Sequence, residues 1–326
     1  MVKKTNLIPS QSNRFAKGFI QAILLFISIF IFSCNEDPVD PEIERLFELQ
    51  LGDKKYKFVN DWVGAIEDCE RLSIGVLIDQ SYGHFGIDFN ILKNGALVKA
   101  SLVDYTMTGG DNDYETANFN EVASMKITNF KYDEAKKYVH FEYSGELLKI
   151  NRPGNPDRIF PPKYIKGVVT ITNLDEYQCN TFLPTARFET PTITFTGVRA
   201  NAQYDSSLSS NRFTHLIYSN NGYRMFFKLK EDFWSFEIGK TNKFDQKTIE
   251  NRIDLEQYIG RLRATQNLYN EQEDWKKFQT AGSFTILERK MVNGIKVTTG
   301  EITIEVYDNG VLVHSILNGA FETSSF

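Results

Sequence analysis

The sequence predicts an all-β fold made of two tandem antiparallel β-sandwich-like domains, with one helix in the second domain. Short runs of alternating apolar and polar residues recur from Ile43 onward, which is typical of half-buried strands. Glycine-containing turn sequences such as Asn94-Gly95 and Asp308-Asn309-Gly310 separate these runs. The second half of the chain also repeats the pattern of the first, so we expect two copies of one β module.

The first domain is predicted over residues 44–183. Residues 47–51 and 55–59 alternate on either side of Gly52-Asp53, which predicts a hairpin. A polar segment at 109–120 and a proline-rich segment at 152–162 predict loops. Further strands are predicted at 72–78, 85–92, 96–103, 122–130, 137–143, 145–150 and 166–172.

The second domain is predicted over residues 184–326, and its segments echo those of the first in the same order. Similar segments in a fixed order are the signature of an internal repeat. A final hairpin is predicted around Asp308-Asn309-Gly310. The matching pairs are 221–229 with 82–90, 283–286 with 124–127, and 299–304 with 144–149.

One segment of the second domain departs from the strand pattern. Asp254 is a suitable N-cap, and Gln257 stands where a capping box places its second residue. We therefore predict a helix from Asp254 to about Gln266, with its apolar side covering the second sandwich. The residues at helical spacing are Leu255, Tyr258, Ile259 and Leu262.

Residues 1–33 have the pattern of a signal peptide. Four cationic residues and no acidic ones precede the apolar block Phe19 to Phe32, which is shorter than the roughly 20 residues that a membrane-spanning helix needs. The block ends at Ile31-Phe32-Ser33-Cys34, which resembles the lipobox of bacterial lipoproteins. The resemblance implies cleavage before Cys34 and a lipid on that residue. The alternative is a retained N-terminus that spans the membrane once.

Residues 34–43 are predicted to form an acidic tether, because two prolines and four acidic residues within eight positions cannot bury a core. This segment is similar to the acidic signal of surface-exposed lipoproteins of the Bacteroidota. It implies an outer-membrane lipoprotein at the cell surface, with the periplasmic face as the alternative.

The end of the chain carries a second resemblance. A strand with Gly300-Glu301, the turn Asp308-Asn309-Gly310 and the segment Asn318-Gly319-Ala320-Phe321 are similar to β domains of uncharacterised Bacteroidota lipoproteins. This resemblance implies an all-β fold and an envelope location. It implies no activity.

The charge of the chain excludes one class of partner. Removing residues 1–33 changes the formal net charge from −5 to −9, because it takes away four positive charges and no negative ones. An acidic chain is a poor ligand for nucleic acid. We therefore expect no nucleic-acid partner.

Two cysteines remain besides Cys34. Cys69 and Cys179 stand near the two ends of the first predicted domain, in a chain expected to be exported. A disulfide between them would close a loop of roughly 110 residues and stabilise the fold by up to about 5 kcal/mol. The alternative is two separate buried thiols.

No motif for metal, cofactor or catalysis is found in the sequence. The histidines stand singly, and Asp111-Asn112-Asp113 lacks the glycine and glutamate that complete a calcium loop. We therefore expect no metal and no cofactor. Trp62 and Trp275 lie in polar surroundings, so they are the expected exposed aromatics and the candidate ligand contacts.

Together these observations favour a non-catalytic binding or structural module, held at the membrane by its N-terminal lipid, with a glycan or a protein as partner. An apolar-ligand carrier is one alternative. The other is a surface hydrolase that degrades polysaccharide. Such an enzyme requires two carboxyl groups roughly 5–10 Å apart in a cleft.

Overall fold

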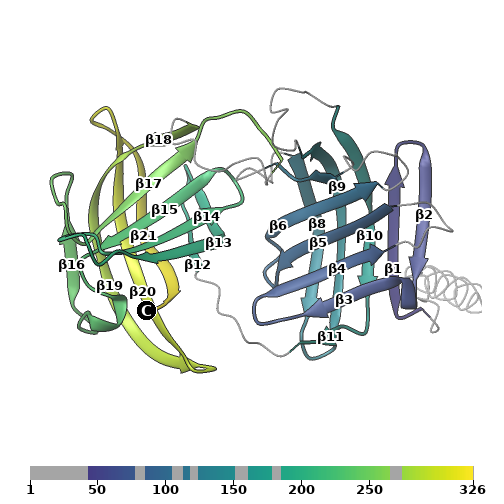
Figure 1. Cartoon of the computed structure of the whole chain (residues 1–326), viewed down its shortest axis with the longest axis horizontal. Helices are drawn as coiled ribbons and strands as arrows, with labels where there is room; N and C mark the ends of the chain where they lie inside the picture. Colours follow the sequence, from purple (N-terminus) through teal and green to yellow (C-terminus); the bar gives the residue numbers. More distant parts are fainter. Residues whose placement is uncertain are drawn as a thin grey trace, which may run out of the picture. The chain divides into compact units, whose positions relative to one another are not determined.

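The structure is a computed structural model, shown in Figure 1, and it describes residues 43–77, 85–104, 113–117, 124–150, 161–177, 185–264 and 274–325. The predicted signal peptide, Cys34 and nearly all of the predicted tether lie outside the described residues. Cys179 lies outside them as well.

The described residues form two separate sheets in which nearly all strand pairs are antiparallel, so the predicted all-β fold class is confirmed. The first sheet has the order β11-β3-β4-β5-β6-β7-β9-β10-β1-β2, and β8 pairs with β9 off this path. A short 3-10 helix, η1 (Asn60–Trp62), joins β2 to β3. The strands are β1 (Arg45–Leu51), β2 (Lys54–Val59), β3 (Val63–Glu67), β4 (Arg71–Leu77), β5 (Phe85–Leu92), β6 (Leu97–Asp104), β7 (Asp113–Glu115), β8 (Met125–Asp133), β9 (Tyr138–Lys149), β10 (Lys163–Ile171) and β11 (Asp175–Glu176).

The first sheet folds back on itself, so that β3 to β6 lie across one face of β8, β9 and β10, and β1 and β2 continue the layer of β10 (Figure 1). Aromatic side chains from both layers fill the space between them. The ring of Phe89 on β5 lies 5.6 Å from Phe141 and 4.5 Å from Tyr143, both on β9. The first sheet is therefore sandwich-like, as predicted.

Buried and half-buried residues alternate along β9, and this alternation determines which side chains lie on each face of the strand. Val139, Phe141 and Tyr143 are buried in the core, whereas the residues between them are only half-buried. Successive side chains of a strand point to opposite faces, so the polar residues of β9 lie on the outer face of its layer.

The second sheet has the order β16-β19-β20-β21-β12-β13-β14-β15-β17-β18. Its core holds Phe195, Phe227 and Phe284, and the 3-10 helix η2 (Phe233–Ser235) adds the buried ring of Phe233. The strands are β12 (Thr185–Glu189), β13 (Thr194–Tyr204), β14 (Phe213–Ser219), β15 (Tyr223–Leu229), β16 (Thr241–Phe244), β17 (Arg252–Tyr258), β18 (Trp275–Lys277), β19 (Gln279–Val292), β20 (Ile295–Asp308) and β21 (Val311–Ser324).

The two sheets share part of their topology. In the first, β8, β9, β10 and β1 are neighbours in that order, and in the second, β19, β20, β21 and β12 follow the same plan. The segments that match in sequence lie on β5 and β15, β8 and β19, and β9 and β20. The two sheets differ in the strands that connect one layer to the other. In the first sheet β7 pairs with β9, whereas in the second sheet β12 pairs with β13.

The predicted helix from Asp254 is wrong for all of its described residues, 254–264, none of which is helical. Arg252–Tyr258 is strand β17, which pairs with β15 on one side and β18 on the other. Its side chains alternate between the sandwich core and a face of ion pairs, which a helix cannot do. Residues 265–273, which include Gln266, lie outside the described residues.

Ion pairs with the neighbouring strand explain why this segment forms a strand and not the predicted helix. Arg224 donates to Glu256 from Nε at 2.7 Å and from a terminal nitrogen at 2.5 Å, and Lys228 donates to Asp254 at 2.6 Å. These pairs allow acidic residues to be buried on the face opposite the core. The apolar stripe that the helix required is absent, since Ile259 is 60% and Leu262 42% exposed.

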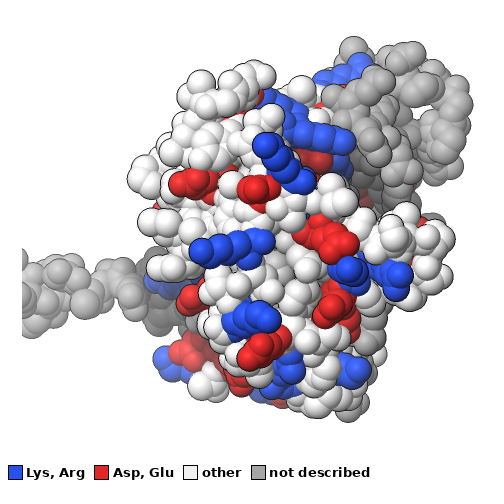
Figure 2. All heavy atoms as spheres, turned by 90° about the vertical axis from the view of Figure 1, so that its left-hand side faces the viewer, with Lys and Arg blue, Asp and Glu red and all other residues white. Residues whose placement is uncertain are grey.

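Charges of both signs are interspersed on the outer face near β16 and β19, which Figure 2 shows facing the viewer. Lys240 lies 3.7 Å from Glu237 in the segment that leads to β16. Lysines and acidic residues therefore alternate on the part of this face that the structure describes.

No helix among the described residues is long and apolar enough to cross a membrane.

His215 is a buried titratable residue in the second sandwich. Only 1% of its surface is exposed, its ring lies 4.8 Å from the ring of Phe233, and its Nδ1 lies 3.0 Å from the hydroxyl of Thr323. Burial lowers the pKa of His215 to about 4, from an ordinary value of 6.5. The folded chain therefore holds this imidazole neutral.

We predict that His215 makes the protein less stable as the pH falls. Between pH 6.5 and 4 the unfolded chain binds a proton at this position and the folded chain does not, so the free energy of unfolding decreases by up to about 2 kcal/mol between pH 7 and 5. Urea unfolding of the wild type and of His215→Gln at pH 5, 6 and 7 measures this. The variant should lose that part of the pH dependence, and an unchanged dependence would contradict the prediction.

Candidate functional site

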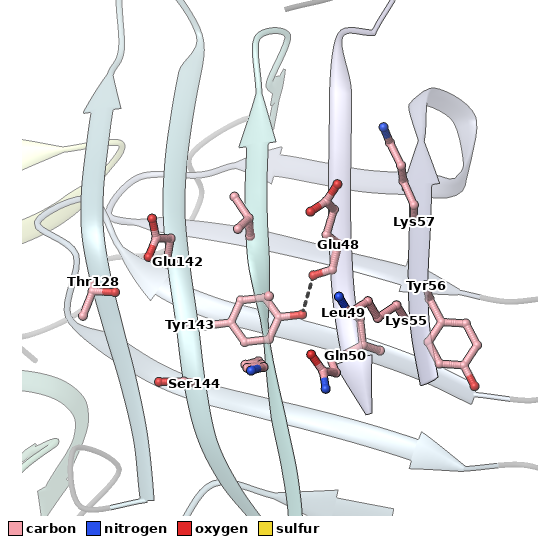
Figure 3. A pocket seen from close by; sticks show the side chains of 13 residues that line it. Glu48, Leu49, Gln50, Lys55, Tyr56, Lys57, Thr128, Glu142, Tyr143 and Ser144 are labelled. Atoms are coloured by element: carbon pink, nitrogen blue, oxygen red, sulfur yellow. Dashed lines mark hydrogen bonds between the residues drawn. The ribbon is translucent and has the colours of Figure 1, made fainter. Parts of the chain in front are cut away.

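A groove of about 470 Å³ crosses the outer face of the layer formed by β8, β9, β10, β1 and β2 (Figure 3). Its walls are side chains that point away from the aromatic core. The strand register places these side chains in two rows that run across the strands, with the backbone of β10 between them.

The first row carries two carboxylates. Glu142 on β9 pairs with Val168 on β10, and Val168 pairs with Glu48 on β1, so the two glutamates lie on the same face on either side of Val168. Thr128 on β8 and Lys57 on β2 extend the row at its two ends. Adjacent strands are about 4.8 Å apart, so the Cα atoms of the glutamates are separated by about 10 Å.

The second row lies two residues further along each strand. Ser144 on β9 pairs with Lys166 on β10, Lys166 pairs with Gln50 on β1, and Gln50 pairs with Lys55 on β2. Figure 3 shows Lys55 extending from β2 toward β1. This row carries two lysines, an amide and a hydroxyl, whereas both carboxylates of the groove lie in the first row, together with Lys57.

The floor of the groove depends on a glycine. Gly167 stands between Tyr143 and Leu49 in the register, and the Tyr143 ring crosses β10 at this point to donate a hydrogen bond from its hydroxyl to the carbonyl oxygen of Glu48, at 2.9 Å (Figure 3). A Cβ at Gly167 would overlap that carbonyl oxygen and press on the tyrosine hydroxyl. A side chain at this position is therefore incompatible with the contact.

Tyr143 is a structural hydrogen-bond donor in this arrangement. Its side chain is buried, and burial, the larger cause, together with the nearby charge of Glu48 raises its pKa above the ordinary value of 10. The hydroxyl therefore stays protonated at physiological pH and donates to the main chain.

A β-bulge shapes the end of the groove at β8. The register between β8 and β9 shifts between Thr128 and Lys131, and Asn129 adopts a left-handed backbone with φ of 52°. Asparagine tolerates this conformation better than most residues. The bulge aims the Asn129 amide at Glu142, to which it donates a hydrogen bond at 2.9 Å.

The groove is chemically suited to hold a polar ligand in water. Thr128, Lys55, Lys57 and Lys166 are exposed, whereas Glu48, Gln50, Glu142 and Ser144 are half-buried. The groove thus offers cations, carboxylates, an amide and a hydroxyl on a rigid sheet. The side chain of Val168 is its apolar part, because Leu49, which also lines the groove, has its side chain buried in the core.

Of the two tryptophans that the sequence predicts to be exposed, the structure exposes one and buries the other. Trp62 is 44% exposed in η1, as expected, and it follows the edge strand β2 of the first sheet. The expected exposure of Trp275 is wrong, because only 7% of it is exposed. Its ring packs 5.2 Å from Tyr258 and 4.0 Å from the guanidinium of Arg224, so it has no free face for a ligand of the kind expected. The structure places the two tryptophans on different sheets.

Cys69 is disulfide-bonded in the structure. Its predicted partner, Cys179, lies outside the described residues, so the pairing itself stays a prediction. Within the described ranges, no group of three or more His, Cys, Asp or Glu residues is placed to hold a metal ion. Asp111 and Asn112 of the calcium-like motif lie outside those ranges, and Asp113 begins β7, inside the segment predicted as a loop.

None of the groove residues was singled out from the sequence. One signal was present, because Glu48, Gln50, Lys55 and Lys57 share one face of the hairpin predicted at 47–51 and 55–59. The other half of the groove comes from β9 and β10, far away in the chain. Their register with β1 is a long-range pairing that local patterns do not contain.

Comparisons of the chain with protein-family models, with curated proteins and with solved structures found no match.

We predict that Tyr143→Phe destabilises the protein by about 1 kcal/mol, because it removes the hydrogen bond to the Glu48 carbonyl while keeping the ring that packs against Phe89. Chemical denaturation measures the change. The control is Tyr164→Phe, which removes a hydroxyl from a tyrosine that is 54% exposed on β10 and should change stability by less than about 0.5 kcal/mol. Equal effects of the two substitutions would show that the hydrogen bond does not hold the groove together.

Proposed function

We propose that this protein is a lipid-anchored cell-envelope binding module that holds a glycan in the groove between the Glu48 and Lys55 rows. The observation that supports this most directly is the groove itself, a polar depression on the outer face of a sheet whose other face is sealed by an aromatic core. Binding surfaces on rigid β scaffolds need little reorganisation when the ligand arrives.

The anchor rests on the sequence at Ile31-Phe32-Ser33-Cys34 and on the acidic tether that follows. Several acyl chains on Cys34 would give stable attachment, since one chain binds a membrane only marginally. We propose that the sheets stand at the outer membrane, on the cell surface or the periplasmic face.

We predict that Cys34→Ser abolishes the incorporation of labelled palmitate into the protein, because the substitution removes the acylated thiol. Metabolic labelling followed by immunoprecipitation measures this, with Cys69→Ser as the control that alters a cysteine and leaves the acylation site. Protease treatment of intact wild-type cells then separates the two locations, since digestion without lysis occurs only at the cell surface. A Cys34→Ser protein that still incorporates palmitate would contradict lipid anchoring at Cys34.

Binding is a better account of the groove than catalysis. Its lysines and Thr128 are exposed to water, and electrostatic stabilisation of a transition state is strongest where water is excluded. Glu142 also has an amide partner in Asn129. These features suit recognition of hydroxyl and charged groups on a ligand.

A polysaccharide hydrolase remains the second candidate, and one observation favours it. Glu48 and Glu142 face the same groove across Val168, and the strand spacing puts their Cα atoms about 10 Å apart, from where the side chains can bring their carboxyl groups into the range of roughly 5–10 Å that glycosidases use. This candidate requires both carboxylates for bond cleavage. The binding proposal requires no cleavage.

We predict that the full mature protein is retarded by at least one polysaccharide in affinity electrophoresis and that Ser144→Tyr, which fills the groove, abolishes the retardation. The matched control is Lys131→Tyr, which puts the same side chain at an exposed position of β8 that does not line the groove.

Two outcomes would contradict the proposal. One is retention of binding in Ser144→Tyr, which would place the ligand elsewhere. The other is release of reducing sugar by the wild type that is lost in both Glu48→Gln and Glu142→Gln, which would make the protein a hydrolase.

A further inference from the structure

The groove separates its charges into two parallel rows. The second row, Ser144, Lys166, Gln50 and Lys55, carries only cations among its charges, and the first row has the carboxylates Glu142 and Glu48 on either side of Val168, with Lys57 beyond Glu48 at its β2 end. The two rows are two residues apart along each strand, which is about 7 Å. Within a row, Lys166 and Lys55 are two strands apart, with Cα atoms separated by about 10 Å. A ligand that lies across the strands therefore meets Lys166 and Lys55 along one edge, and along the other it meets both carboxylates, with Lys57 at the β2 end.

Lys166 has no role in the protection of a sheet edge. Lys54, Lys55 and Lys57 lie on β2, the last strand in the order of the first sheet, where lysines commonly prevent edge-to-edge association. Lys166 lies on β10, which is paired on both sides by β9 and β1. Protection of a sheet edge therefore does not explain why a lysine stands at position 166 in the groove.

The backbone of the groove constrains the kind of ligand. The strands β9, β10 and β1 are paired with one another along the groove, so their main-chain groups are used within the sheet. An extended peptide gains most of its affinity from main-chain hydrogen bonds at a free sheet edge. A ligand on this face is recognised by side chains instead, which suits a molecule that carries many hydroxyl groups and charges of its own.

We propose that the groove binds a saccharide that bears carboxylate groups, an oligomer of a hexuronic acid, lying across β9, β10, β1 and β2. Its carboxylates pair with Lys166 and Lys55, and its ring hydroxyls donate hydrogen bonds to Glu48 and Glu142. Gln50 and Ser144 complete the polar contacts between these groups. The inference rests on the proposed glycan-binding function and adds the chemical class of the glycan.

The charge pattern has a direct consequence for binding. Both lysines are exposed, so their attraction for a carboxylate is screened by salt. Binding therefore weakens as the ionic strength rises. Esterification of the ligand carboxylates should have the same effect at low salt, because it removes the charge and keeps the hydroxyl groups.

The test uses the full mature protein and three polyuronates, namely polygalacturonate, alginate and polyglucuronate, each compared with its methyl ester by affinity electrophoresis and calorimetry. We expect at least one polyuronate to bind, and its methyl ester to bind at least tenfold more weakly. Lys55→Glu and Lys166→Glu should each weaken binding by about tenfold, which corresponds to about 1.4 kcal/mol. The matched control is Lys54→Glu, which makes the same charge change on β2 at a residue that does not line the groove.

The outcomes separate this inference from the function on which it rests. Equal binding of a polyuronate and its methyl ester, or equal loss in Lys54→Glu and the two groove variants, would overturn the acidic ligand and leave glycan binding in place. If none of the three polyuronates binds, while a neutral polysaccharide binds and Ser144→Tyr blocks its binding, the acidic ligand is again overturned and glycan binding is left in place. Failure of every polysaccharide would overturn both.

Discussion

The hydrogen bond from the Tyr143 hydroxyl to the Glu48 carbonyl joins strands that are 95 residues apart in the chain. It passes across Gly167, so it adds a side-chain link from β9 to β1 over β10, and the link fits only the register in which Gly167 stands between Tyr143 and Leu49. The same ring packs against Phe89 in the aromatic core. The core and the outer face of this layer are thus linked through one residue.

The consequences of that register reach the surface of the protein. With Tyr143 turned inward, its neighbours Glu142 and Ser144 must turn outward, because successive side chains alternate. The pairing then brings them beside Val168 and Lys166, and these in turn beside Glu48 and Gln50. A shift of one residue in any of the three strands would bury these polar residues and scatter the rows. The constraint that stabilises the core is therefore also the one that builds the groove.

The fold class could be predicted because it depends on short-range sequence patterns, namely alternating apolar residues and turn sequences. The alternation at 47–51 and 55–59 appears in the structure as the hairpin of β1 and β2, and the turn Asp308-Asn309-Gly310 joins β20 to β21. The candidate site could not be predicted in the same way. Half of it depends on the pairing of β10 with β1, and no local pattern specifies which distant strand is the neighbour.

The errors of prediction have a common physical cause. The sequence predicts a helix at β17 because Leu255, Tyr258, Ile259 and Leu262 stand at helical spacing after the N-cap candidate Asp254. Cross-strand partners on β15, Lys228 and Arg224, decide in favour of the strand by neutralising both acidic residues of β17. Trp275 looked exposed because charged residues surround it in sequence. In the structure one cation, Arg224, packs on its ring and helps to bury it.

Lysine footprinting would test the central claim, that the groove is the ligand site, most directly. The mature protein is acetylated with and without a saturating polysaccharide that it binds, and the modification of each lysine is followed by mass spectrometry. Lys55 and Lys166 should react several-fold more slowly in the complex, while Lys54 on the same strand as Lys55 should react at an unchanged rate. Protection elsewhere with Lys55 and Lys166 unchanged would show that the ligand binds at another surface.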